Sequence, residues 1–235
     1  EVSKYTGSQE ILGGRVKTLH PKIHAGILNK RNNKSHHQDL VKNKFENIDL
    51  VIVNFYPFKD TLKNTSNHEK IVENIDVGGP TMVRAAAKNY NDVTVITSSE
   101  QYPELISELN INKGCTSLKF RKKMSSLAFA ETSFYDSVIS EYFNKILKNQ
   151  LPKRLVIHGN LIEKLRYGEN PHQESAIYSQ NNNLKINQIH GKKLSYNNYN
   201  DIFSALAISK SFPKNIGTVI VKHTNPCGVS IKKNQ

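Results

Sequence analysis

Two short apolar runs constrain the fold of this chain more than any other feature: 49–55 (DLVIVNF) and 92–97 (DVTVIT). Each run is rich in Val and Ile and is bounded by polar residues, as in strands buried on both faces of a parallel sheet. Helical patterns fall at 68–74, 81–89, 99–110 and 116–147. Strands that alternate with helices predict an α/β fold with a parallel sheet for this part of the chain.

A break at 148–153 (KNQLPK) follows the last of these helices. It is polar and contains a proline, so it predicts a boundary between two domains, 1–149 and 150–235. The second domain has its own helical pattern at 202–211 and a third apolar run at 217–221. Each domain is therefore expected to contain both helix and strand.

The charge of the chain favours an anionic partner. Lys and Arg number 33 against 20 Asp and Glu, a formal net charge of +13, which suits nucleotides, folates or nucleic acid. Most of this charge is scattered lysine mixed with asparagine, a pattern that a codon bias explains equally well. A basic nucleic-acid-binding protein is the competing class, but no RNA- or DNA-binding motif is visible, so we expect no nucleic-acid partner.

No motif for a metal, a membrane or an oxidising compartment is visible. The two cysteines, Cys115 and Cys227, lie far apart, and the adjacent His36 and His37 are expected to be exposed without further ligands at suitable spacing. There is no signal peptide and no run of about 18 apolar residues. We therefore expect a cytoplasmic protein without a metal.

The segment 13–26 (GGRVKTLHPKIHAG) gathers cations and glycines. Arg15 offers a planar fork for phosphate and Lys17 a mobile charge that can also move protons, while glycines allow a ligand to approach the backbone. The segment lacks helical or strand periodicity, so residues 1–28 are predicted to be a loop region. It is either a site for an anionic ligand or a basic surface loop.

Polar groups also follow the first predicted strand and precede the helix at 81–89. Asn54 and Tyr56 come directly after the strand, where α/β sheets bind ligands, although Tyr56 could instead pack against the sheet edge. The pair Gly78-Gly79 before a helix start would leave N–H groups free for an anion. Asp76 and Lys88 flank that start and would converge only if the loop folds back.

The segment 165–173 (LRYGENPHQ) is predicted to be a rigid loop because Gly and Pro punctuate it. Arg166 and Tyr167 make a clamp for a phosphate and a ring, and His172 could donate to the same ligand. The alternative is a turn that carries an exposed basic cluster.

The end of the third apolar run predicts a general base. The run delivers Lys222 and His223 into a Pro- and Gly-containing loop, a placement that suits proton transfer beyond a strand. The polar stretch 191–201 precedes the helix at 202–211, and its Asn197 and Asn198 could bind a carboxamide or only cap a turn.

Five blocks occur in the order of one known family. The chain resembles the bifunctional purine-synthesis family that joins AICAR transformylase to IMP cyclohydrolase in RVKTLHP (15–21), NFYPF (54–58), IDVGGPTMVRAAAKN (75–89), LRYGENPHQ (165–173) and KHTNPCG (222–228). A stand-alone methylglyoxal-synthase-like protein is an alternative for residues up to about 147, but the second half argues against it. The chain starts with Glu and stops soon after the last block, so we expect a fragment.

The resemblance implies a fold and an activity. Residues 1–149 would be an incomplete methylglyoxal-synthase-like cyclohydrolase domain, and residues 150–235 the start of a cytidine-deaminase-like α/β transformylase domain. The two reactions would be formyl transfer from 10-formyltetrahydrofolate to AICAR and closure of formyl-AICAR to IMP. These nucleotides are the implied partners, the full-length form would be a homodimer, and neither chemistry needs a metal. The fragment alone is expected to be inactive.

The resemblance also implies roles for individual residues. The implied catalytic residues are Lys17, Tyr56, Asp76 and Lys88 for ring closure, and Lys222 and His223 for formyl transfer. The implied substrate-binding residues are Arg15, Val16, Thr18, Val53, Asn54, Val77, Gly78, Gly79, Arg166, Tyr167, His172 and Asn198.

Overall fold

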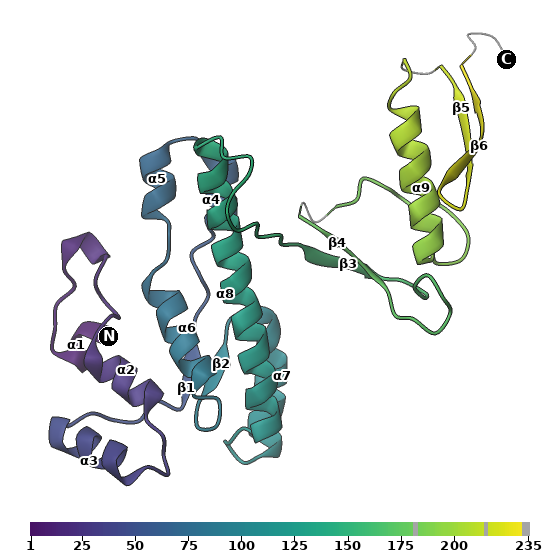
Figure 1. The fold of residues 1–235 in the computed structure, drawn as a ribbon. Helices are drawn as coiled ribbons and strands as arrows, with labels where there is room; N and C mark the ends of the chain where they lie inside the picture. The colour runs from purple at the N-terminus through teal and green to yellow at the C-terminus, as the bar shows by residue number, and fades with distance from the viewer. Residues whose placement is uncertain (181–182, 214–215, 232–235) are drawn as a thin grey trace. The chain divides into compact units, whose positions relative to one another are not determined.

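The computed structural model of the chain describes residues 1–180, 183–213 and 216–231. It divides into two compact units, Glu1–Val156 and Ile157–Gln235 (Figure 1), each of which has its own elements. The assignment of 1–149 and 150–235 to two catalytic domains stays a prediction.

The sheet of the first unit is parallel, as predicted. β1 (Leu50–Ile52) pairs with β2 (Thr94–Ile96) in the register Val51↔Val95. All three residues of β2 are buried, but the expected burial of the first strand on both faces is wrong, since Leu50 is 38% and Ile52 46% exposed. Successive side chains of a strand point to opposite faces. Only Val51 enters the core, while its neighbours line an open pocket of about 470 Å³.

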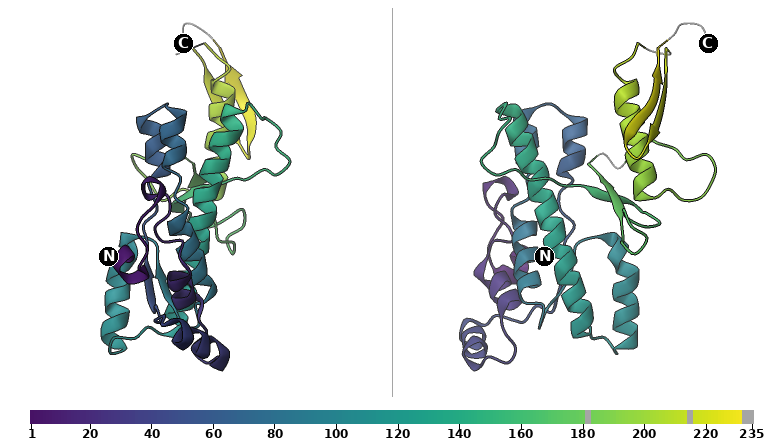
Figure 2. Two further views of the ribbon diagram at one scale, coloured as in Figure 1. Left: turned by 90° about the vertical axis from the view of Figure 1, so that its left-hand side faces the viewer. Right: turned by 45° about the vertical axis from the view of Figure 1, so that its right-hand side comes forward.

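Helix α6 (Gly78–Lys88) is the centre of the first unit. It packs against α2 (Pro21–Leu28), α8 (Leu118–Ile146) and both strands, and Figures 1 and 2 show it alongside α8. The buried face of α6 carries Val83 and the run Ala85–Ala87. Small side chains let the neighbouring backbones approach closely, so the helix can join the sheet to two other helices.

Helix α6 begins at Gly78 rather than at Thr81, where the sequence pattern placed its start. Both glycines and Pro80 therefore lie in its first turn, where proline is tolerated because those N–H groups lack an intrahelical partner. The carboxylate of Asp76 accepts a hydrogen bond from Gly79 N at 2.8 Å. This contact satisfies one of the helix's free donors and fixes where the helix starts.

The long helix α8 carries a second core cluster, as its aromatic stripe predicts. Phe58, Ile71, Tyr135 and Val138 are buried together. Phe58 belongs to α4 (Phe58–Asn64) and Ile71 to α5 (His68–Glu73). The predicted helix after the second strand is also present, as η2 (Ser99–Gln101) and α7 (Tyr102–Ile111), and α7 adds Leu105 to the core around α6.

The prediction that residues 1–28 form a loop region is wrong. That part contains α1 (Val2–Thr6), η1 (Leu12–Gly14) and α2. Two features nucleate α2: Pro21 occupies its first turn, and the His20 ring accepts a hydrogen bond from Lys22 N at 3.1 Å. Ile23 and Ile27, one turn apart, anchor the helix in the core.

The polar stretch after α2 folds into α3 (Lys34–Asn43), capped by Asn33. His37 is exposed as expected, but His36 is half-buried, and its Nδ1 accepts a hydrogen bond from Lys30 N at 3.1 Å. Among the residues that the structure describes, no helix has the length and apolar character needed to cross a bilayer.

In its described residues, the second unit contains two antiparallel hairpins and one helix. β3 (Asn160–Lys164) pairs with β4 (Ala176–Ser179), and β5 (Thr218–Lys222) pairs with β6 (Asn225–Ser230). The predicted loop 165–173 is the connection of the first hairpin. The expectation of a loop after Lys222 is wrong, because 225–230 returns as a strand.

Helix α9 (Tyr196–Ser209) begins earlier than the predicted 202–211. Ser195 and Asn198 form a reciprocal capping box, in which the Ser195 side chain accepts from Asn198 N and the Asn198 side chain accepts from Ser195 N. A capping box stabilises a helix start through two donors at once. The polar residues 196–201 are therefore helical despite their composition.

Candidate functional site

The segment 15–18 lies against the turn that precedes α6. Arg15 forms an ion pair with Glu73, with 3.1 Å between Nη2 and Oε2, and both side chains are exposed. Thr18 faces Gly78 so closely that a Cβ at Gly78 would overlap the Thr18 hydroxyl. The fold thus brings together two motifs that are about sixty residues apart in the sequence.

The hydrogen bond that caps α6 also requires a glycine at position 79 of the turn Asp76–Gly79. A Cβ at Gly79 would overlap the Asp76 carboxylate, the group that accepts the Gly79 N–H. The sequence suggested that the Gly-Gly pair leaves its N–H groups free for an anion. Since the Gly79 N–H already donates to Asp76, at most one of the two remains free. The positive end of the helix dipole nevertheless lies at this turn.

Lys17 and Tyr56 lie close enough for the charge of Tyr56 to affect the pKa of Lys17. Glu10, whose carboxylate is 2.9 Å from Lys17 Nζ, raises the pKa of Lys17, and Tyr56 adds to the effect. Tyr56 is 58% exposed, so it does not pack against the sheet edge. With Asn54 it lines a pocket of about 300 Å³ beyond the carboxyl ends of β1 and β2. This is the position at which α/β sheets bind ligands.

Lys88 is not brought to Asp76. It is the last residue of α6, about 15 Å along the helix axis from Gly78 at 1.5 Å per residue. There it lines a separate pocket of about 510 Å³ together with Arg84, Tyr90 and Phe129. The turn does not fold back, since Asp76 is fixed to the opposite end of the helix.

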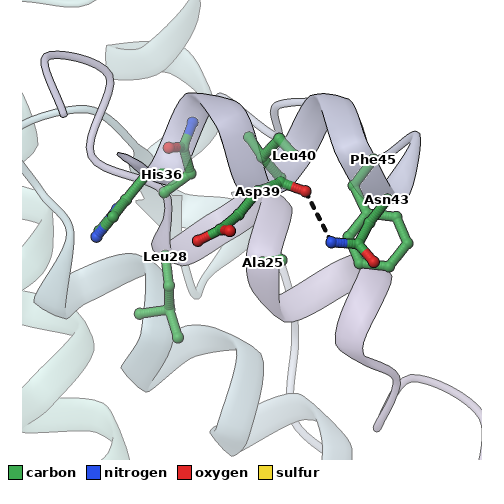
Figure 3. Close-up of a pocket in the computed structure, with 8 residues that line it drawn as sticks. Ala25, Leu28, His36, Asp39, Leu40, Asn43 and Phe45 are labelled. Carbon is green, nitrogen blue, oxygen red and sulfur yellow. Dashed lines mark hydrogen bonds between the residues drawn. The ribbon is translucent and has the colours of Figure 1, made fainter. Parts of the chain in front are cut away.

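A further pocket, of about 250 Å³, lies between α2 and α3 (Figure 3). His36, Asp39, Leu40 and Asn43 point into it from α3, and the Asn43 amide donates to the Asp39 carbonyl at 2.8 Å. None of the residues that the sequence singled out for the site lines this pocket.

In the second unit, the loop 165–173 lies against the start of α9. Arg166 donates to the Tyr167 hydroxyl at 3.1 Å, with its guanidinium 4.8 Å from the ring centroid. This donation, helped by Ser195, lowers the pKa of Tyr167. The Tyr167 carbonyl accepts from Tyr196 N at 3.4 Å, which joins the loop to the helix.

Asn198 and His172 have different surroundings at this junction. The Asn198 Oδ1 accepts from the Ser195 amide at 3.0 Å and from its hydroxyl at 2.9 Å, so the oxygen serves the helix cap. His172 lies exposed in the loop.

The turn that carries His223 is tied to α9. His223 and Thr224 both have positive φ, 53° and 63°, between the paired Lys222 and Asn225. Two such residues in succession make the tight turn that a two-residue hairpin requires. The carboxylate of Asp201, on α9, accepts from Thr224 N at 2.8 Å. Helix α9 therefore connects the His223 turn with the loop 165–173.

Sequence reasoning missed the partners that hold these motifs. Glu10, Glu73 and Asp201 are acids in polar stretches, and Tyr135, which bonds to the Asp76 turn, belongs to an apolar stripe. No local signal separates them from ordinary surface or core residues. In the described part of the chain, no group of three or more His, Cys, Asp or Glu is placed to hold a metal ion.

The fold and these motifs define an α/β protein in which a basic segment contacts a glycine-containing helix start in the first unit, and a basic loop is joined to a helix start in the second. A family model described as "AICARFT/IMPCHase bienzyme" matches residues 86–235, and one described as "MGS-like domain" matches residues 1–81. The chain belongs to the AICARFT/IMPCHase bienzyme family. The resemblance inferred from the five blocks, and the fold class with it, are confirmed.

Similar proteins are named "Bifunctional purine biosynthesis protein PurH". The one from Bradyrhizobium diazoefficiens is 45% identical over an alignment of 236 positions, which covers 98% of this chain and 44% of that protein. The one from Rippkaea orientalis is 46% identical over an alignment of 240 positions, which covers 98% of this chain and 46% of that protein. The chain thus spans less than half the length of these relatives.

One solved structure adds a comparison of folds. It is described as "Crystal structure of ForH" and aligns with a TM-score of 0.51 and 31% identity. The alignment covers 61% of this chain and 74% of that chain.

Proposed function

We propose that the chain carries parts of two nucleotide sites of purine biosynthesis, one for closing formyl-AICAR to IMP and one for formyl transfer to AICAR. The observation that carries the proposal is the contact of the 15–18 segment with the Asp76–Gly79 turn at the start of α6. It supports an anionic ligand at the positive end of a helix. Membership of the bienzyme family supports the identity of that ligand.

Ring closure joins two parts of one substrate. The carboxamide nitrogen attacks the formyl carbon, and water leaves after the carbonyl oxygen gains protons. Because the reaction is intramolecular, the protein's task is to fold the substrate and move protons. Lys17 and Tyr56 would move protons, and Asp76 would orient the substrate.

The family motif adds further residues to this proposal. Lys88 is proposed as a catalytic residue on the family motif alone, since its pocket lies at the opposite end of α6 from the Asp76–Gly79 turn. The residues proposed to hold the nucleotide are Arg15, Val16, Thr18, Val53, Asn54, Val77, Gly78 and Gly79.

Formyl transfer needs a base. The AICAR amine is a poor nucleophile because its lone pair is delocalised into the ring and carboxamide. As the amine attacks the formyl carbon of 10-formyltetrahydrofolate, His223 would take its proton. The bond between N10 and the formyl carbon would then break, and the proton would pass to N10 so that tetrahydrofolate leaves neutral. Lys222 would stabilise the developing negative charge.

AICAR would bind where the loop 165–173 meets the start of α9. The residues proposed there are Arg166, Tyr167, His172 and Asn198. The formyl donor is a cosubstrate, the partners are small nucleotides, and the proposed setting is a cytoplasmic homodimer without metal, nucleic acid or membrane.

The test assays both reactions in a protein of the relatives' length that carries this sequence. Lys17→Ala should lower the rate of ring closure at least about tenfold and leave formyl transfer unchanged. His223→Ala should lower formyl transfer about 10²–10⁴-fold, the usual contribution of a positioned base, and leave ring closure unchanged. Lys30→Ala, at an exposed lysine, is the control. Equal loss of both reactions in either variant would contradict the proposal.

A further inference from the structure

Tyr135 of α8 touches two segments of the first unit, the one that follows β1 and the turn that precedes α6. Its hydroxyl accepts a hydrogen bond from Asp76 N at 2.8 Å and donates to Asn74 O at 3.4 Å. Its ring lies 5.2 Å from that of Phe55 and 6.2 Å from that of Phe58, centroid to centroid. The residue is only 7% exposed, so these contacts are made away from water.

The two segments are those that carry predicted site residues. Phe55 lies between Asn54 and Tyr56 at the carboxyl end of β1, and Asp76 starts the turn before α6. Tyr135 also lines the pocket shared by Asn54 and Tyr56. One side chain therefore spans the distance between the strand end and the helix start.

The Tyr135 hydroxyl suits this position because it can accept one hydrogen bond and donate another at the same time. Burial raises the pKa of Tyr135 above its ordinary value, so the group stays neutral at physiological pH. The Asp76 amide precedes α6 and has no place in its hydrogen-bond ladder. Removal of its acceptor would leave a partly buried donor unpaired, which is costly.

We propose that Tyr135 is a positioning residue for ring closure, whose hydroxyl holds the Asp76–Gly79 turn at a fixed separation from the 54–56 segment. The proposal rests on the proposed function of the first unit. The effect passes from the Asp76 amide to its carboxylate, which caps Gly79, and so to the helix start that faces Thr18. A small displacement there moves substrate contacts without touching the reacting atoms.

The test compares Tyr135→Phe with Tyr142→Phe, in a protein of the relatives' length that carries this sequence. Tyr142 lies on the same helix, packs against Phe58, and bonds through its hydroxyl to His68 Nδ1 at 2.8 Å. Each variant removes one hydroxyl and keeps the ring in the same cluster. Only Tyr135→Phe removes a contact with the turn.

Three measurements are made on both variants. Hydrogen exchange at the Asp76 amide should speed up at least about tenfold in Tyr135→Phe and stay unchanged in Tyr142→Phe. The kcat of ring closure should fall about tenfold in Tyr135→Phe with a smaller change in KM, while formyl transfer stays at its unsubstituted rate. Exchange at the Gly114 amide, which bonds to Leu109 O far from the turn, reports that the fold is intact.

The possible results distinguish a failure of the Tyr135 inference from a failure of the proposed function on which it rests. Equal ring-closure rates in the two variants, with an active unsubstituted protein, would overturn the role of Tyr135 and leave the proposed function standing. A parallel loss of ring closure and formyl transfer in Tyr135→Phe would also overturn it, since it would mean general destabilisation. Absence of ring closure in the unsubstituted protein would overturn both.

Discussion

At the scale of the single residue, His24 is a titratable group in an unfavourable place. It is half-buried on α2, and its Nε2 is buried without a hydrogen-bond partner among the described residues. Burial disfavours the imidazolium and lowers the pKa of His24. The unfolded chain therefore takes up the proton first as the pH falls. The stability that the neutral ring provides is present above the ordinary pKa of 6.5 and is lost as the pH falls through the lower folded value.

We predict that His24→Gln reduces the acid sensitivity of the chain. Glutamine cannot titrate, so the loss of unfolding free energy between about pH 7.5 and pH 5.5 should be smaller than in the unsubstituted chain. Urea unfolding at both values measures the difference. His37→Gln, at an exposed histidine of α3, should keep the original pH dependence. If His24→Gln and His37→Gln behave alike, His24 is not the group responsible.

At the scale of the element, helix ends decide where the site residues lie. The start of α6 is fixed by Asp76, that of α9 by Ser195 with Asn198, and that of α2 by His20 with Pro21. Each cap places a polar motif at a helix terminus. Substitutions that disturb a cap should therefore act on the motif as well as on stability.

Gly79→Ala should destabilise the first unit by about 1–3 kcal/mol, because the added methyl group overlaps the Asp76 carboxylate and must displace the cap. Urea unfolding measures the change. Thr81→Ala, which removes the exposed hydroxyl that bonds to Val77 O, is the control and should cost less than about 1 kcal/mol. If the Gly79→Ala chain had the same unfolding free energy as the control, the statement that a side chain at position 79 overlaps Asp76 would be contradicted.

Asp201→Ala should loosen the His223 turn. The Thr224 amide loses its carboxylate acceptor, so its hydrogen exchange should speed up at least about tenfold. Asn200→Ala, at the adjacent residue of α9, should leave that exchange unchanged. Unchanged exchange in Asp201→Ala would mean that the hairpin holds its turn without α9.

The sequence predicts elements better than their boundaries. The apolar runs around Val51 and Val95 and the stripe of α8 identify a parallel sheet and a long helix, because burial dominates those segments. The start of α2 and the strand 225–230 escape prediction, since a cap and a cross-strand partner decide them. Neither feature appears as a periodic pattern of apolar residues, which is the signal on which the prediction of elements rests.

The candidate site shows the same contrast between what the sequence predicts and what it does not. Gly78 is found from the glycine pattern and Thr18 from the resemblance to the family, whereas the contact between them appears only in the structure. The position of Lys88 at the far end of α6 depends on where the turn is fixed, which the sequence left open. The supporting Tyr135 is hidden in an apolar stripe, because a buried tyrosine looks like any core aromatic.

At the scale of the whole molecule, the chain spans 44–47% of the length of its relatives. Several of its predicted site residues are open to solvent: Tyr56 and Lys88 line open pockets, and His172 lies exposed in a loop. Catalysis of either reaction needs a substrate held away from water by converging groups. Because these pockets are open, we expect the 235 residues alone to supply only part of such an enclosure.

We therefore predict that the isolated 235-residue chain has negligible activity in both reactions. Purified chain would be incubated with AICAR and 10-formyltetrahydrofolate, and separately with formyl-AICAR, and IMP would be measured by chromatography. A protein of the relatives' length is the positive control. IMP formation by the isolated chain above the uncatalysed rate would show that the rest of such a protein is dispensable.

The central claim is that the 15–18 segment and the Asp76–Gly79 turn form one nucleotide site at the start of α6. A crystal structure with IMP, of a protein of the relatives' length that carries this sequence, tests it most directly. We predict that the nucleotide lies between Thr18 and Gly78, with polar atoms of both segments within hydrogen-bond distance. A nucleotide bound instead in the pocket between α2 and α3, or in the pocket lined by Lys88, would contradict the claim.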